Sequence, residues 1–528
     1  MNKNSFAAIK VGLLVYLLIT VLLPIIMLFL QIRGEHIENV FISAQFLPML
    51  RNSLITTLIS TVISIVLAFV LAYVINRTNV RFKSIFMVIF TIPMLIPSIS
   101  HGMGLVLLFG DNGLLTNLLG LSIDLYGYCG IIMGSVLYSF PVAFLMFYDS
   151  LQYEDYTTYE AADVLGLSKW RQFVTITMPS MERTLLSAIL AVFTMVFTDY
   201  GVPLMTGGTV MTLPVYMYRE VIGMMNFSNG AVIGVILLTP AVIAFVGDLK
   251  NSNTSGASST VVKAFQIKEN KPRDIFAYIF LGASFLIMCL PIIGFVCLSF
   301  VKQYPIDLRF TFGNITKLIS NGIGMYFVNS IAVALLTALI GTCLSYFAAY
   351  CTTRSKKSIS NQVLHFMSML PLAFPGVVLG LSYVMTFKSF PLYGTIFMLV
   401  IVNIIHFFSS PYLMAYNSLT KFNPNLEDVA HTLGIGQMRM LVNVYVPSTL
   451  YTIVEMYSYF FVNAMITISA VSFLMNFRTM PLALLIPQLE SQSFIEGTAL
   501  VSLMILGINL FEKCVAFFVK RWIKINNI

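Results

Sequence analysis

The chain has 528 residues, of which 58% are hydrophobic and only 10% are charged. A soluble domain usually carries about 25% charged residues, so this composition excludes an ordinary soluble protein and indicates a polytopic helical membrane protein. The formal net charge of +8 would suit nucleic acid or acidic lipid. In a membrane protein, however, Lys and Arg gather on the cytoplasmic side, so we interpret the excess as topology and expect membrane lipid, and no nucleic acid, as a partner.

Apolar runs of roughly 20 residues recur along the whole chain and predict an all-α fold of about twelve transmembrane helices. The first run follows Lys10 and is too long for a signal peptide, so we expect an uncleaved span. The predicted spans are 11–31, 52–75, 85–109, 130–151, 182–205, 230–248, 275–301, 328–351, 362–388, 392–419, 449–475 and 497–519.

Counting basic residues in the connecting segments predicts the orientation. With the N-terminus inside, most of the 30 Lys and Arg residues fall on the inner side. The sequence therefore predicts a multi-pass protein of the bacterial cytoplasmic membrane with both termini in the cytoplasm.

The chain divides into two similar halves. A small, polar stretch begins at Asn251 and reads as a flexible linker over 251–273, between a first six-helix domain, 1–250, and a second, 274–528. Short motifs recur at nearly constant offset. Arg51-Asn52-Ser53 is matched by Val328-Asn329-Ser330, Tyr73 and Arg77 by Tyr350 and Arg354, and Pro93 and Pro97 by Pro371 and Pro375. Recurrence of this kind indicates a duplicated domain, and an even number of spans per half makes the repeats parallel. We expect the prolines to kink the third and ninth spans.

A polar loop also occurs twice, at 155–180 and 422–448. The first copy reads Glu160-Ala161-Ala162-Asp163-Val164-Leu165-Gly166 and is followed by Pro179. The segment before Gly166 suits a short helix, Gly166 can adopt the positive φ that ends it, and Pro179 suits the first turn of the next span. The second copy repeats this pattern with Glu427, Asp428, Ala430, Gly434 and Pro447. Two equal polar loops on the inner side favour docking of a partner over an ordinary interfacial helix. Ala161 and Ala162 would let that partner approach closely, and Glu160 and Asp163 would meet its basic groups.

The pattern Glu-Ala-Ala, three residues, Gly and a later Pro resembles the EAA loop of binding-protein-dependent ABC importer permeases. The second copy departs from it, since Asp428-Val429-Ala430 stands where Glu-Ala-Ala is expected. Two such loops on one chain resemble the fused permeases of the iron(III), thiamine and 2-aminoethylphosphonate importers, and Phe197-Thr198-Asp199-Tyr200-Gly201-Val202-Pro203 looks like that subgroup as well.

The resemblance implies a type I ABC importer permease fold and a subunit that forms the translocation path. It also implies two ABC ATPase subunits at the cytoplasmic face, docked on the EAA loops, and an extracytoplasmic solute-binding protein. The chain has no Gly-x-x-x-x-Gly-Lys-Ser/Thr loop, so it is expected to be no enzyme and to bind no cofactor, with ATP used by the partner subunits. We expect no metal site. The cargo favoured by this analogy is an organophosphonate or another small anion, or iron(III), with thiamine and polyamines as alternatives.

Polar groups late in a span are candidates for the translocation path. Asp199 precedes Tyr200 and Gly201, which suggests a broken helix end that lines a cavity; a carboxylate reaching the outer interface is an equal alternative. The matching stretch of the second half holds Thr467 and Ser469 and no charge.

Two other classes of protein compete with this interpretation. A twelve-span secondary transporter of the major facilitator type, coupled to protons or other ions, also has two parallel halves, but it usually carries acids or bases deep in its spans. A membrane-embedded enzyme would need paired carboxylates or clustered histidines at one depth, and the sequence shows neither.

Overall fold

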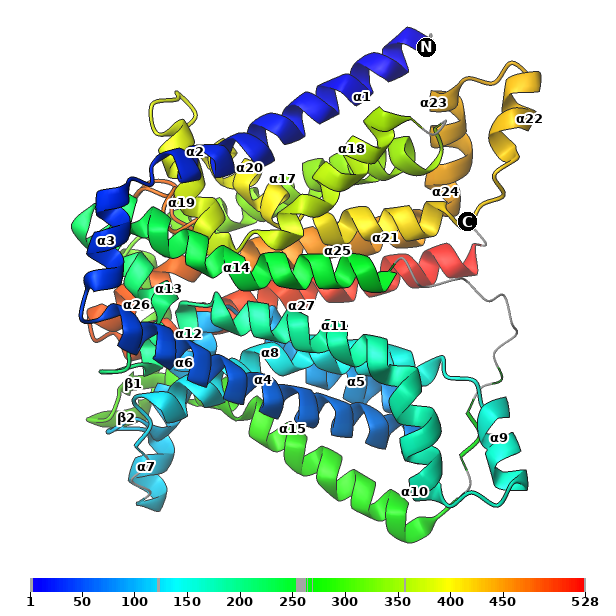
Figure 1. The fold of residues 1–528 in the computed structure, drawn as a ribbon. Helices are drawn as coiled ribbons and strands as arrows, with labels where there is room; N and C mark the ends of the chain where they lie inside the picture. The colour runs from blue at the N-terminus through cyan, green and yellow to red at the C-terminus, as the bar shows by residue number, and fades with distance from the viewer. Residues whose placement is uncertain are drawn as a thin grey trace. The chain divides into compact units, whose positions relative to one another are not determined.

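The computed structural model describes residues 3–120, 124–252, 263, 265–267, 269–355 and 358–526. These residues form helices, apart from loops and one short hairpin of strands (Figure 1). Most of the predicted linker, including Thr254 to Thr260, lies outside the described residues.

Packing divides the chain into two compact units with interleaved sequence. Unit 1 contains residues 1–43, 217–241 and 299–528, and unit 2 contains residues 44–216 and 242–298. This division follows contacts, whereas the predicted halves follow the repeated motifs, so the domain boundaries at 250 and 274 stay a prediction.

Unit 2 is built around the long helix α4, which packs against α8 and α11. Alanines and aromatic rings such as Ala68, Phe140 and Phe144 are fully buried between these helices. The helices that lie in this unit or begin in it are α4 (Phe46–Arg77), α5 (Lys83–Thr91), α6 (Ser98–Phe109), α7 (Leu114–Leu119), α8 (Tyr128–Gln152), α9 (Thr157–Val164), α10 (Lys169–Gln172), α11 (Met178–Phe197), α12 (Gly201–Thr206), α13 (Leu213–Tyr218) and α15 (Lys271–Ser299).

Unit 1 is built around the equivalent long helix α17, which packs against α20, α21 and α25. Ala334, Ala338 and Phe460 are fully buried at the contact with α25. Its helices are α1 (Lys3–Leu17), α2 (Leu23–Leu30), α3 (Gly34–Ile42), α16 (Gly313–Ser320), α17 (Ile323–Thr353), α18 (Ile359–Met369), α19 (Gly376–Phe387), α20 (Ile396–His406), α21 (Ser409–Leu419), α22 (Leu426–Thr432), α23 (Gln437–Met440), α24 (Val446–Ser448), α25 (Leu450–Ile466), α26 (Leu482–Ser491) and α27 (Ile495–Ile525), with α14 (Phe227–Ser252) beginning in this unit.

The helices confirm the all-α polytopic class. Within the described ranges, nine helices are long and apolar enough to cross a membrane, or up to eleven if two bent pairs each count as one span. The remaining predicted span, 449–475, is shorter than expected, because α25 ends at Ile466 after 17 residues. The prolines break the helices more sharply than a kink: a 3₁₀ turn of four residues separates α5 from α6 and α18 from α19, and the second break bends the chain by 111°.

The strands β1 (Val301–Gln303) and β2 (Asp307–Phe310) pair antiparallel just after α15 and form a hairpin that the apolar runs do not predict. Asp307 lies between Lys302 and Arg309, at 3.2 and 2.7 Å, and hydrogen bonds, chiefly from the side chain and backbone of Arg309, hold the pKa of its carboxyl below the ordinary range. Charged residues alternate here with apolar ones such as Ile306 and Leu308, and such alternation suits a strand rather than an apolar helix.

Candidate functional site: two coupling segments

The two repeated polar loops, 155–180 and 422–448, each fold as a short helix, a tight turn and a second helix. We call them the first and the second coupling segment. In unit 2, α9 ends at Val164, and Gly166 has a φ of +72°. The N–H of Gly166 donates to the carbonyl of Asp163, and the N–H of Leu167 donates to the carbonyl of Ala162. These two bonds make the Schellman cap that satisfies the last carbonyls of a helix, and it needs a residue in the left-handed region.

The second loop has the same cap. Gly434 has a φ of +70°, its N–H donates to the carbonyl of His431, and the N–H of Ile435 donates to the carbonyl of Ala430 at 2.8 Å. A Cβ atom added at either glycine would meet nothing within 4 Å. The glycines are therefore required by backbone conformation and not by a neighbouring side chain.

Behind each turn the chain enters the membrane helix through a π-helical segment. The segments are Phe173–Thr177 and Leu441–Tyr445, five residues each, and the sequence pattern did not predict them. Pro179 lies in the first turn of α11, and Pro447 lies in α24 directly before α25. Single π-helical turns inside α-helices are frequent at functional sites, and here they recur at the same place in both repeats.

The tips of both segments expose large apolar side chains. Val164, Leu165 and Trp170 are 88%, 77% and 72% exposed, and Val429 and Leu433 of the second segment are 53% and 68% exposed. Ala161 is exposed, whereas Ala162 and Ala430 are buried against their own chain. The close approach expected at two alanines is thus open at Ala161 alone.

The acids of the first segment have partners within the chain. Lys263 Nζ lies 2.5 Å from Glu160 Oε1, and Lys169 Nζ lies 2.7 Å from Asp163 Oδ1, which also accepts from the Gln172 amide. In the second segment Asp428 is exposed and makes no ion pair with any residue that the structure describes. The two segments therefore share a backbone but differ in charge.

A buried arginine joins the first segment to the end of α4. Arg77 forms an ion pair with Glu154, and both side chains are 7% exposed. The Tyr159 hydroxyl donates to Glu154 Oε1 at 2.7 Å and lies 2.7 Å from the Thr177 hydroxyl. Burial raises the pKa of Tyr159 well above its ordinary value, so the phenol stays protonated and remains a donor.

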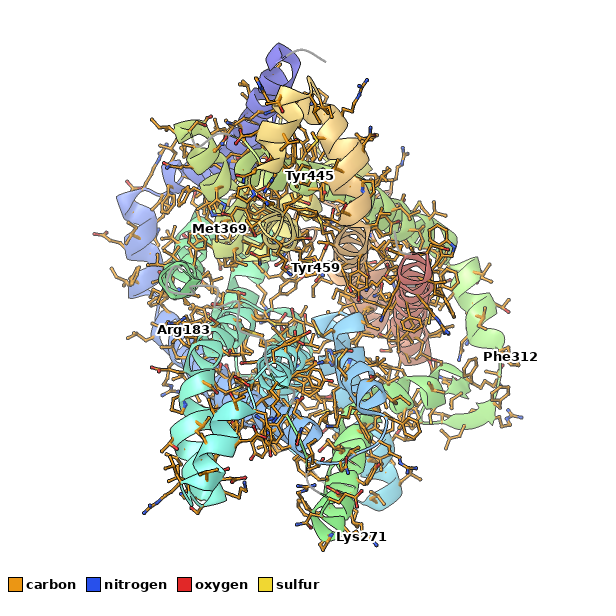
Figure 2. The ribbon with its side chains drawn as sticks, turned by 90° about the vertical axis from the view of Figure 1, so that its right-hand side faces the viewer. Arg183, Lys271, Phe312, Met369, Tyr445 and Tyr459 are labelled. Carbon is orange, nitrogen blue, oxygen red and sulfur yellow. The ribbon has the colours of Figure 1, made fainter. Side chains whose placement is uncertain are left out.

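The second segment is joined to the end of α17 in the same way (Figure 2 labels Tyr445). Arg354, with a side chain 4% exposed, binds Glu427 through Nε at 2.6 Å and Nη2 at 2.5 Å. Its other donors reach the carbonyls of Phe422 and Asn423 at 3.1 and 2.8 Å. The Tyr445 hydroxyl also donates to Glu427. Burial, as the main cause, and the hydrogen bond to this carboxylate, as the second, raise the pKa of Tyr445 to about 12. A bidentate arginine pair fixes geometry as well as charge.

Residues of the described part of the linker pack on the first segment. The Phe265 ring lies 3.6 Å from the Arg77 guanidinium carbon and makes edge contacts with Tyr156 and Tyr159. The N–H of Tyr156 donates to the carbonyl of Lys263 at 3.1 Å. The N–H of Lys263 donates to Asp155, whose pKa is lowered mainly by hydrogen bonds from Thr157.

At the opposite end of α4, an Asn-Ser pair holds the chain that leads into α13. The Asn52 amide donates to the carbonyl of Met211 at 3.1 Å, and Ser53 Oγ accepts from the N–H of Leu213 at 2.8 Å. In unit 1, Asn329 donates to the carbonyl of Arg478 at 2.8 Å and Ser330 accepts from the N–H of Leu482 at 2.7 Å, directly before α26. The repeated Asn-Ser motif thus has one structural role in both repeats.

Asp199 lies beside this Asn-Ser end of unit 2. It accepts from the backbone N–H groups of Gly201 and Val202, at 3.3 and 3.0 Å, and so caps α12 after the break at Tyr200. It also lines a small cavity of about 10 Å³, whose other lining residues, polar and apolar, are Ser53, Thr56, Thr57, Ile131, Ser135, Val196, Phe197, Pro203, Thr212 and Pro214. The helix break is present between Phe197 and Gly201, whereas the role of Asp199 in a translocation path stays a prediction.

Thr467 and Ser469 follow the end of α25 in unit 1. Thr467 is buried, and Ser469 lies against Gly376, where an added Cβ would come within 2.2 Å of its hydroxyl oxygen. The same position is flanked by His406, 2.9 Å from that Cβ through Nε2. Among the described residues there is no group of three or more His, Cys, Asp or Glu placed to hold a metal ion.

Comparison with known proteins agrees with the duplicated architecture. A family model described as "Binding-protein-dependent transport system inner membrane component" matches residues 64–249 and again residues 341–524, more than half of the chain. The chain is 24% identical over 413 residues to the putative ferric transport system permease protein FbpB 1 of Haemophilus influenzae, covering 73% of this chain and 64% of that protein.

Other relatives carry different names. The thiamine transport system permease protein ThiP of Brucella suis is 23% identical over 313 residues, which covers 56% of this chain and 55% of ThiP. A spermidine/putrescine transport system permease protein PotC homolog of Mycoplasma pneumoniae is 33% identical over 122 residues, which covers 23% of this chain and 41% of that protein. In each case the match spans less than two thirds of the relative's own length.

Proposed function

Because the chain belongs to the family of binding-protein-dependent transport system inner membrane components, we propose that it is the permease subunit of an ATP-driven importer of the bacterial cytoplasmic membrane. It forms the translocation path and takes its driving force from separate ATPase subunits. A solute-binding protein on the outer side delivers the cargo. The family match also counts against the alternative of a secondary transporter of the major facilitator type.

The observation that carries the proposal is the pair of coupling segments with equal backbone geometry. Each exposes apolar side chains at the tip of a capped helix, where a cleft in another protein can receive them. Leu165 and Leu433 occupy the same position beside the two glycines and are 77% and 68% exposed. Apolar residues at the centre of an interface, surrounded by polar groups, are typical of docking surfaces.

For the cargo we propose a small solute of the kinds named in the relatives, ferric iron or thiamine, with an organophosphonate as a further candidate. The half-buried carboxylate of Asp199 supports a cationic cargo, because it supplies a negative charge beside the hydroxyl side chains of Ser53, Thr56 and Thr57 at a break between two helices. Both termini are proposed to face the cytoplasm. In unit 1, Lys10 contacts the start of α18 at Ser360, close in sequence to Arg354, which binds the second coupling segment.

The test is affinity purification of the tagged permease from its native membranes, with mass spectrometry of what is retained. We expect ATPase peptides that contain a phosphate-binding loop, and their loss in a Leu165→Asp, Leu433→Asp double variant. The matched control is Leu118→Asp, which changes an exposed leucine of α7 outside both segments. Retention of the ATPase by the double variant, or absence of any ATPase from the wild type, would contradict the proposal.

A further inference from the structure

The ends of α4 and α17 carry the same three chemical groups, an arginine, a carboxylate and a phenol, but in the second repeat the carboxylate and the phenol each stand one aligned position later along the chain. Glu154, Tyr159 and Thr177 of the first repeat align with Phe422, Glu427 and Tyr445 of the second. Arg77 therefore meets its carboxylate before the short helix and its phenol within it, whereas Arg354 meets its carboxylate within the short helix and its phenol behind the turn.

This difference between the repeats has a physical reason. A buried arginine without a carboxylate is strongly destabilising, so the acid can occupy different sequence positions in the two repeats only where it still reaches the guanidinium. In the first repeat the acid, Glu154, lies directly before the coupling segment, and in the second the acid, Glu427, lies within it; in both repeats the arginine lies at the end of the long helix. An arginine–glutamate ion pair therefore connects the coupling segment to the long helix in both repeats, although the two glutamates do not stand at aligned positions.

The other end of each long helix is also fixed. Asn52 and Ser53 hold the backbone before α13, and Asn329 and Ser330 hold the backbone before α26. Between Asn52 and Arg77 α4 is an uninterrupted helix of about 25 residues, or about 38 Å at 1.5 Å per residue. Ser53, Thr56 and Thr57 of this helix line the cavity that contains Asp199.

We propose that α4 and α17 transmit the movement of the coupling segments to the translocation path, with Arg77 and Arg354 as the positioning residues that engage them. A displacement of α9 is passed through the Arg77–Glu154 pair to α4 as a rigid body. Its far end then moves the cavity wall and the backbone before α13. This inference rests on the proposed function. It adds the identity of the helix in each repeat that transmits the movement.

The test uses a cysteine in the cavity as a reporter that needs no knowledge of the cargo. Ser135→Cys is placed on α8, in a chain whose six native cysteines are replaced by serine, and its maleimide labelling rate is measured with and without ATP and vanadate. We expect the rate to change about five- to tenfold on trapping when coupling is intact. Glu154→Phe should abolish the change while the ATPase still co-purifies and hydrolyses ATP.

Rescue separates transmission from a merely structural role. The triple variant Glu154→Phe, Tyr159→Glu, Thr177→Tyr gives the first repeat the residues of the second and should restore the labelling change. Asn52→Ala acts at the far end of α4 and should abolish the change with the ATPase retained, which keeps the proposal testable if Glu154→Phe does not fold. Arg81→Met, an exposed arginine four residues beyond Arg77, is the matched control and should label as the wild type does.

Each result has a distinct meaning. An unchanged labelling response in Glu154→Phe or in Asn52→Ala, or a triple variant that stays unresponsive although folded and ATPase-bound, overturns the role of α4. A wild-type permease that retains no ATPase overturns the proposed function itself. If Glu154→Phe loses both the ATP-dependent labelling change and the bound ATPase, Arg77 acts in docking, and the inference is also overturned.

Discussion

Substitution of the two turn glycines gives the sharpest test of the coupling segments. Gly166 and Gly434 have φ values of +72° and +70°, and an added Cβ at either would meet nothing within 4 Å. A non-glycine L-residue pays about 1–2 kcal/mol in the left-handed region, and the cost is smallest for asparagine. We therefore expect Gly→Ala to destabilise the local helix by about 1 kcal/mol, Gly→Val by more and Gly→Asn by less.

The expected loss is local, since the cap is the end of a short exposed helix and not part of the core. A loss of about 1 kcal/mol lowers the ratio of formed to unformed segment about fivefold. Hydrogen exchange of the amides in α9 and α22 measures this local opening. Titration of the purified permease with its ATPase measures the consequence for docking. The sites are in separate segments, so the double alanine variant should lose about the sum of the two effects.

The order of the substitutions decides between a conformational role and a contact role. If the glycines act through backbone conformation, asparagine protects docking better than alanine although it is larger. The opposite result is a loss of docking that grows with side-chain size, from alanine to asparagine to valine, while the hydrogen-exchange rates of α9 stay at the wild-type level. In that case the partner touches the glycine directly and the reasoning is refuted. Gly507→Ala in α27, another position where an added Cβ meets nothing, is the control and should leave docking unchanged.

Three further outcomes follow from individual contacts. Gly341→Ala should lower the melting temperature, with a loss of about 1–3 kcal/mol, because its Cβ would lie 2.9 Å from the Phe460 ring; Gly507→Ala, without such a neighbour, should leave the melting temperature unchanged or raise it slightly. Asp155→Asn should lower stability at neutral pH, as hydrogen bonds from the nearby threonine hold the pKa of Asp155 below its ordinary value. Since a lowered folded-state pKa stabilises above the unfolded value of about 3.9, the difference between wild type and variant in a pH series of melting curves should vanish as the pH falls through the folded-state pKa; a constant difference down to that pH would contradict it. Asp199→Asn keeps a side-chain oxygen to cap α12 but removes the charge from the cavity, so uptake of ferric iron or thiamine should fall with melting temperature and ATPase docking unchanged, whereas equal loss in stability and uptake would assign Asp199 to the cap alone.

The features that the sequence predicted correctly are those with a local cause. Hydrophobic runs predict membrane helices because burial in lipid needs only the run itself, and all-α architecture follows from it. The turn at Gly166 is equally local, since few residues other than glycine adopt its φ readily. The breaks at Pro93 and Pro371 were visible for the same reason, although a 3₁₀ turn replaces the expected kink.

The features that the sequence analysis missed depend on contacts between distant segments. The recurrence of Arg77 as Arg354 was noted, but basic residues at the ends of spans were interpreted as topology alone. Their partners Glu154 and Glu427 do not align with each other in the repeat, so no offset reveals the pairs. The recurrence of a basic residue at constant offset, beside a loop rich in acids, was the available evidence for a buried ion pair. It indicates which arginine takes part but not which acid binds it.

The acids of the first segment were expected to meet a partner's basic groups, yet Glu160 and Asp163 lie 2.5 and 2.7 Å from lysines of this chain. One of these lysines, Lys263, belongs to the linker, whose small polar composition suggested only flexibility. Composition predicts whether a segment can form a core of its own, but it does not predict whether single residues of that segment pack on a neighbouring helix.

The two repeats therefore preserve geometry more strictly than charge. Backbone caps, π-helical segments and Asn-Ser pairs recur at matching positions, because each is needed to hold a helix end in one place. The surfaces that face outward differ: the first segment has its acids neutralised by lysines, and the second exposes Asp428 beside Val429. A partner that docks on both segments must accept the shared apolar tip in each, so apolar contact and backbone shape, and not a common ion pair, are the features through which it can recognise both.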